Sequence, residues 1–119
     1  MVTATPAQAR TVRALPLDPA EFGTPMPFPT VARSSAAFDP TDHWRGLARL
    51  DQSCFATEGL RRHGWTQDAR RAVEHLLATA DGPGGDGPAR ENYDPLTGRG
   101  RNSTHVSWSA ALLLSLLRL

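Results

Sequence analysis

Proline dominates one continuous part of the chain and limits what that part can fold into. Between positions 16 and 40, six prolines interrupt any regular ladder of backbone hydrogen bonds, because proline has no N–H group and a fixed φ. Large apolar side chains are interleaved with these prolines, namely Phe22, Met26, Phe28, Val31 and Phe38. A solvated linker does not carry so many apolar side chains. The segment is therefore expected to be irregular and to pack against a core.

Apolar periodicity predicts helices on both sides of this segment. They are expected at residues 6–15, 47–63, 68–80 and 107–119, with Thr66 as the candidate N-cap of the third. The third has the clearest pattern, with apolar residues at intervals of three and four, and the fourth is apolar on almost every face. No segment alternates convincingly between polar and apolar residues. The sequence therefore predicts an all-α fold, with residues 1–14 as a tail or short helix and residues 15–119 as the main body.

Charge and composition argue against several classes of function. The formal net charge is +1, so we expect no nucleic-acid partner, and no apolar run is long enough to span a membrane. The single cysteine, Cys54, cannot form an internal disulfide, so a cytoplasmic location is the default. The four histidines lack paired short spacings, and no HExxH, CxxC or nucleotide-binding glycine motif occurs. No metal or cofactor is expected.

Two short stretches, HWRG at 43–46 and ENYDPLTGRG at 91–100, carry the residues of chemical interest. The Asp-Pro and Thr-Gly pairs of the second are typical of a turn, but a turn has no need of Glu91. Taken singly, each motif stays open to a structural interpretation. Trp44 could anchor a core, Arg45 could pair with a nearby carboxylate, and Glu91 could be a solvated loop residue.

The order of motifs along the chain resembles that of a known family. From about Leu15 to the end, the chain reads LDPAEFGTPMPFPTVARSSAAFDP, HWRG, GLRRHGW, ENYDPLTGRG and VSWSAALLLSLL. This series resembles the C-terminal portion of glycoside hydrolase family 63-like enzymes, which include mannosylglycerate and glucosylglycerate hydrolases and processing α-glucosidases. One such motif would be weak evidence, whereas five in the same order are fairly specific.

The resemblance implies a partial (α/α)6 barrel and an inverting hydrolase of α-glucosides or α-mannosides such as mannosylglycerate. In such enzymes a carboxylic acid protonates the leaving oxygen while a carboxylate activates water. Glu91 matches the general base, and the HWRG stretch matches the family's YWRG sugar-site segment. The expected substrate contacts for a carbohydrate are His43, Trp44, Arg45, Tyr93 and Trp108.

Two departures from the family pattern affect these expectations. His43 stands where the family has tyrosine, and Arg49 stands where a second sugar-stacking tryptophan is expected. The family's general acid lies upstream of the matched region and has no counterpart here, so the chain is expected to be nearly inactive alone. It could be a fragment, the product of a broken gene, or one piece of a split enzyme whose companion chain carries the rest of the barrel. The alternatives are a non-catalytic helical module that binds sugar or protein, and an ordinary small helical protein.

Overall fold

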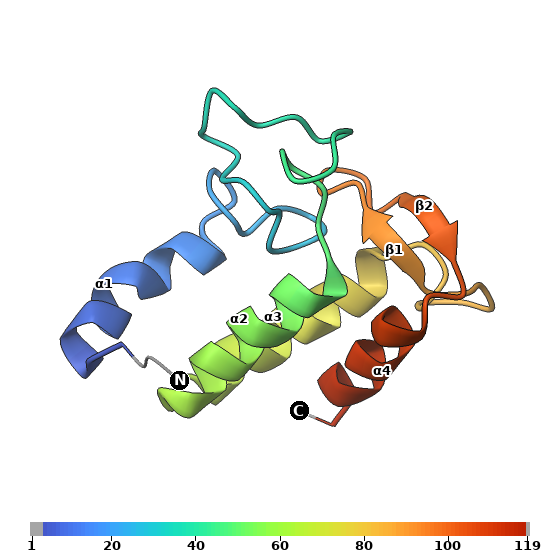
Figure 1. The fold of residues 1–119 in the computed structure, drawn as a ribbon. Coiled ribbons are helices and arrows are strands. Elements are labelled where there is room, and N and C mark those ends of the chain that lie inside the picture. The colour runs from blue at the N-terminus through green and yellow to red at the C-terminus, as the bar shows by residue number, and fades with distance from the viewer. Residues whose placement is uncertain (1–3, 119) are drawn as a thin grey trace.

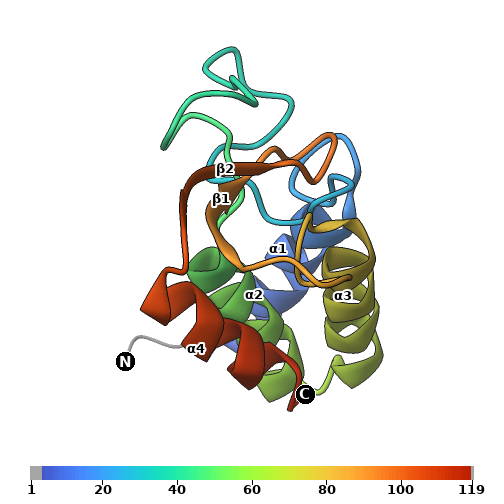
Figure 2. The same ribbon diagram turned by 90° about the vertical axis from the view of Figure 1, so that its right-hand side faces the viewer.

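A computed structural model describes residues 4–118 and contains four helices and one β-hairpin. The elements follow in the order α1 (Pro6–Leu17), α2 (Leu50–Arg62), α3 (Thr66–Thr79), β1 (Arg90–Tyr93), β2 (Gly100–Thr104) and α4 (Ser107–Leu116). Figure 1 shows α2 and α3 side by side as an antiparallel pair, with α1 standing to one side of them. Figure 2 shows α4 lying against α2, with the hairpin above both.

The helices begin and end where their local chemistry dictates. Thr5 caps α1 in a reciprocal capping box with Gln8, and Pro6 occupies the first turn, where a missing N–H is tolerated. The turn between α2 and α3 contains Gly64, whose φ of 83° favours glycine. No helix in the described part of the chain is long and apolar enough to cross a membrane.

The prediction of an all-α fold is wrong, because β1 and β2 form an antiparallel sheet. The strands are only four and five residues long and largely polar, so they give no alternating pattern in the sequence. The prediction of a partial (α/α)6 barrel is also wrong, because the described elements are four helices and a β-hairpin. The expected helix over 47–63 begins only at Leu50, because Ala48 is extended and bonded to β1.

The core lies where the helical pair, the hairpin and the proline-rich segment meet. Its buried cluster comprises Met26, Ala48, Leu50, Val73, Leu76, Ala80, Tyr93 and Leu116. Met26 is fully buried, and its backbone N–H donates to the carbonyl of Pro95 in the hairpin turn. Phe28 is also buried, so the structure confirms that the proline-rich segment packs against a core.

Candidate functional site

The HWRG stretch and the ENY stretch, far apart in the sequence, lie next to each other in the fold. Ala48 exchanges two backbone hydrogen bonds with Tyr93, at 2.8 and 2.9 Å, and also bridges to Pro29 on its other side. A strand-like segment of the proline-rich region, the end of the 43–49 loop and β1 are therefore held together by backbone pairing. This pairing brings Glu91 and Trp44 into one region of the molecule.

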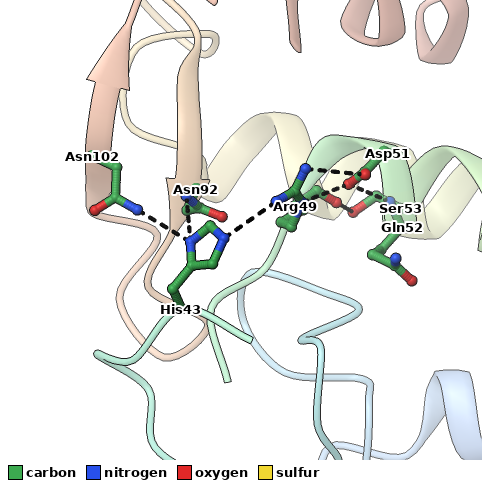
Figure 3. A network of polar contacts seen from close by, with 7 residues as sticks. All are labelled: His43, Arg49, Asp51, Gln52, Ser53, Asn92 and Asn102. Atoms are coloured by element: carbon green, nitrogen blue, oxygen red, sulfur yellow. Dashed lines mark hydrogen bonds and ion pairs between the residues drawn. The ribbon is translucent and has the colours of Figure 1, made fainter. Parts of the chain in front are cut away.

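His43 lies at the centre of a polar network that crosses between these segments (Figure 3). Its Nδ1 is 3.3 Å from Nδ2 of Asn92 on β1 and 3.4 Å from Nδ2 of Asn102 on β2. Its Nε2 is 3.5 Å from Nη1 of Arg49. A neutral imidazole has one acceptor nitrogen, so the ring can accept from the asparagine side or from Arg49, but not from both. The network connects the residue before Trp44 with the residue after Glu91.

Arg49 occupies the position where the family pattern led us to expect a tryptophan, and it covers Trp44. The guanidinium carbon lies 4.6 Å from the centre of the Trp44 ring. Asp51 holds the same guanidinium through two hydrogen bonds of 3.1 and 3.3 Å. The Arg49 side chain is only 13% exposed, so most of the charged group is shielded from water. One surface of the indole is therefore stacked by a cation, an interaction that favours a fixed ring orientation.

Trp44 is exposed and has a strained backbone. Its side chain is 57% exposed, which excludes the role of a core anchor. Its φ is 65°, in the left-handed region that bulky residues rarely adopt. Such strain persists only where surrounding contacts enforce it, and it is common in binding and catalytic sites. The His43 and Trp44 rings are nearly perpendicular, with their centres 5.1 Å apart.

Glu91 lies in β1 opposite an irregularity in β2. Arg90 and Asn92 of β1 are two positions apart in the sequence. Their partners in β2, Thr104 and Arg101, are three positions apart. β2 therefore carries one extra residue, a β-bulge at Asn102, which adopts a left-handed φ of 58°. The Glu91 side chain is partly buried, and within residues 4–118 its carboxylate has no ion pair or hydrogen bond.

The remaining predicted site residues differ in where the structure places them. Tyr93 is fully buried in the core, where its hydroxyl accepts a 2.8 Å hydrogen bond from the backbone N–H of Arg90. Burial raises the pKa of the Tyr93 phenol above its usual range, so the hydroxyl keeps its proton at neutral pH. Arg45 is exposed, pairs with Asp42 at 3.8 Å and donates to the carbonyl of Ala37.

Trp108 lies at the start of α4 and is 54% exposed. Among the ring contacts of the described residues, none joins it to Trp44, so the structure does not bring these two indoles into direct contact. Sequence reasoning missed Asn92 and Asn102 as members of the network around His43. Their only signal was the position of Asn92 directly after Glu91, since the contacts themselves span 49 and 59 residues of sequence.

Residues 1–109 match the model of the mannosylglycerate hydrolase MGH1-like glycoside hydrolase domain. The chain belongs to this family. It is 40% identical over 86 residues to a mannosylglycerate hydrolase of Thermus thermophilus, an alignment that covers 72% of this chain and 20% of that enzyme. It is also 35% identical over 94 residues to the glucosylglycerate hydrolase of Mycolicibacterium hassiacum, covering 75% of this chain and 19% of that enzyme.

Solved structures of this family have the same fold over the shared region. A glycoside hydrolase family 63 mannosylglycerate hydrolase from a second strain of Thermus thermophilus, solved with Tris and D-glycerate, superposes with a TM-score of 0.80 at 29% identity. The superposition covers 98% of this chain and 27% of that one. The family 63-like membership expected from the motifs is thus confirmed. The chain spans about a fifth of the length of the relatives that it matches.

Proposed function

We propose that this chain is the C-terminal segment of an inverting glycoside hydrolase that acts in the cytoplasm on α-mannosides or α-glucosides such as mannosylglycerate. Glu91 is its general base. The observation that carries this proposal is the network in which Asn92, the neighbour of Glu91, contacts His43, the neighbour of Trp44. It holds the strand that carries Glu91 beside the loop that carries the exposed Trp44 indole. A carboxylate and an aromatic platform are two of the groups that a sugar-hydrolysing site uses.

The chemistry assigned to Glu91 is removal of a proton from water. In an inverting reaction this water attacks the anomeric carbon on the face opposite the leaving group, while a separate carboxylic acid protonates the leaving oxygen. Within residues 4–118 no ion pair or hydrogen bond engages the Glu91 carboxylate, so its oxygens are left available to a water molecule, which supports the role.

The substrate contacts are proposed on the surface around Glu91. Trp44 offers the exposed part of its indole for packing against a sugar ring, and His43 and Arg45 flank it in the same loop. Trp108 offers a second exposed indole at the start of α4. For Tyr93 we propose an indirect part in substrate binding, because its buried side chain fixes the strand that carries Glu91.

We assign the general acid to the part of the full-length family enzymes that lies outside the region aligned with this chain. Protonation of the leaving oxygen by a positioned acid contributes about 10²- to 10⁴-fold in rate, so the isolated chain is expected to be nearly inactive. A companion chain, or the remainder of the same polypeptide, would supply this group. The unmatched part of the Thermus thermophilus relative, of which the alignment covers 20%, is the natural source of a test partner.

A chimera tests the proposal. In it, this chain replaces the matched segment of the Thermus thermophilus mannosylglycerate hydrolase. We expect the chimera to hydrolyse mannosylglycerate with release of the β-anomer first, observed by proton NMR, and the isolated chain to give no product. Turnover by the isolated chain, or retention of the α-anomer by the chimera, would contradict the proposal.

A second candidate function, a non-catalytic sugar-binding or protein-interaction module, is favoured by one observation. Arg49 stacks on Trp44 and reduces the apolar platform available to a sugar ring. Calorimetric titration of the isolated chain with disaccharides separates the candidates. Binding that Trp44→Ala abolishes, together with an inactive but folded chimera, would favour the sugar module over the hydrolase.

A further inference from the structure

Both ring nitrogens of His43 face protein groups, so the imidazole has no polar atom left for a substrate (Figure 3). Nδ1 faces the amides of Asn92 and Asn102 on the hairpin, at 3.3 and 3.4 Å. Nε2 faces Nη1 of Arg49 at 3.5 Å. Any effect of His43 on a reaction must therefore pass through the residues that it contacts.

Arg49 decides which nitrogen of the His43 ring carries the hydrogen. A guanidinium has only N–H donors and no acceptor, so Nε2 must offer its lone pair to Arg49. A hydrogen on Nε2 would point at a donor nitrogen and its positive charge. The amide nitrogens of Asn92 and Asn102 face Nδ1, but half a turn of either amide brings its oxygen to the same place. The contacts are satisfied by a neutral ring whose hydrogen is on Nδ1 and donates to an asparagine oxygen.

His43 completes the set of contacts that hold the Arg49 guanidinium. Asp51 accepts from Nε and Nη2 of Arg49, which leaves Nη1 to His43. The guanidinium held in this way stacks on the Trp44 ring, with its carbon 4.6 Å from the ring centre. Trp44 has a φ of 65°, a conformation that a bulky residue keeps only where neighbouring contacts enforce it. Release of the Arg49 guanidinium should therefore let the indole of Trp44 turn.

The strand that carries Glu91 has a separate support. Ala48 exchanges two backbone hydrogen bonds with Tyr93, and the side chain of Tyr93 is fully buried. Neither of these contacts involves the side chain of His43. Loss of the imidazole should therefore move Trp44 and leave Glu91 in place.

We propose that His43 is a positioning residue for Trp44. With its hydrogen on Nδ1, it holds Arg49 against the indole and joins the loop to the hairpin through Asn92. Its effect falls on the binding of the sugar ring, because packing against an aromatic ring depends on the orientation of that ring. The proposal rests on the proposed function only in taking Trp44 as the platform for a sugar. The position of the hydrogen does not depend on any reaction.

Nitrogen-15 NMR of the chain tests the position of the hydrogen directly. His43 should show a pyrrole-type shift at Nδ1 and a pyridine-type shift at Nε2, the reverse of the form that predominates in an exposed imidazole such as His75. The signals are assigned by their loss in His43→Phe. In Arg49→Met, which keeps a long side chain without a donor, the pattern of His43 should revert to that of His75. A pyrrole-type shift at Nε2 of the wild type, or averaged shifts at both nitrogens, would overturn the proposal.

The same spectra test the effect on Trp44. Nuclear Overhauser contacts between the Trp44 indole and the Arg49 side chain should be present in the wild type and lost in His43→Phe. His43→Gln places an amide oxygen where it can accept from Arg49 in place of Nε2, so it should recover part of these contacts. Contacts that persist unchanged in His43→Phe would show that Asp51 alone holds the guanidinium, and would contradict the role of His43.

Kinetics of the chimera separate positioning from a general loss of structure. His43→Phe should raise KM for mannosylglycerate by about 3- to 10-fold and change kcat by less than about twofold. His63→Phe is the matched control, since His63 stacks on Trp65 with ring centres 5.4 Å apart and lies outside the network, and it should leave both constants unchanged. A fall in kcat at constant KM would indicate a smaller folded fraction and would contradict the proposal. A wild-type chimera without activity would contradict the proposed hydrolase instead, and the NMR results alone would then decide the role of His43.

Discussion

On the β1–β2 hairpin Asn92 and Tyr93 are fully buried, whereas on α1 and α4 Val12 and Trp108 are more than half exposed. The hairpin region is closed by its own contacts, since Ala48 pairs with β1 and Met26 bonds to the hairpin turn. The outer helices leave apolar side chains without cover. The comparison teaches that the part bearing Glu91 is held by contacts within this chain, while the outer helices contribute much less buried apolar surface to its stability.

The largest expected effect on stability comes from the closed region. Tyr93→Ala removes a fully buried ring and the acceptor of the Arg90 N–H, so it should lower the free energy of unfolding by about 3–5 kcal/mol. Trp108→Ala removes a ring of similar size from the open region and should cost about 1 kcal/mol or less. Urea denaturation followed by circular dichroism measures both. Equal losses would remove the distinction between the two regions.

The hairpin turn should show a smaller effect. The Asp94 side chain accepts hydrogen bonds from the backbone of Leu96 and Thr97, at 2.9 and 3.2 Å, and from Arg101 at 3.2 Å. Asp94→Ala should therefore lower the free energy of unfolding by about 1–3 kcal/mol. Asp86→Ala, in the exposed loop after α3, is the control and should have almost no effect. Indistinguishable unfolding midpoints for the two variants would show that the turn is not held by its aspartate.

The attachment of α1 should be weaker still. Arg13→Ala removes one exposed ion pair and one cation–π contact, so the global loss should be about 1 kcal/mol or less. Hydrogen exchange should nevertheless become faster in α1 while the amides of α3 keep their protection. Arg10→Ala on the same helix serves as control. Faster exchange in both helices would mean that α1 and the core unfold as one unit.

The smallest effect concerns pH. Hydrogen bonds from Arg61 and Arg62 lower the pKa of Glu58 to about 2 from an ordinary value of 4.5. The folded pKa lies below the unfolded one, so this stabilisation is present above pH 4.5 and is lost as the pH falls towards 2. The midpoints of wild type and Glu58→Gln should therefore differ slightly at neutral pH and converge near pH 2. A difference that grows as the pH falls would contradict this sign.

The elements that the sequence predicted best are those whose stability is encoded locally. The helix predicted at 68–80 is α3, at Thr66–Thr79, because the apolar face repeats with the helical period. Its N-cap is Trp65 and not the predicted Thr66. The hairpin was missed because β1 and β2 are short and largely polar, and because β1 is also held by Ala48, a partner far earlier in the chain. Strand pairing of this kind leaves no trace in a local pattern.

The candidate site was predictable only in part, because its motifs are local in the sequence whereas its contacts are not. The motifs pointed to Glu91 and Trp44, and the structure brings their segments together through Asn92 and His43. The effect of the Arg49 substitution could not be predicted in full. Sequence reasoning anticipated the loss of an aromatic platform, but the stacking of Arg49 on Trp44 depends on Asp51, which fixes its guanidinium.

The most direct test of Glu91 as the general base is the rate of mannosylglycerate hydrolysis by the chimera that carries Glu91→Gln. Glutamine keeps the size of the side chain but cannot take a proton from water, so kcat should fall by about 10²- to 10⁴-fold with little change in thermal midpoint. Glu74→Gln, on the exposed face of α3, should leave kcat unchanged. A Glu91→Gln chimera that retains more than about a tenth of the wild-type kcat would contradict the assignment.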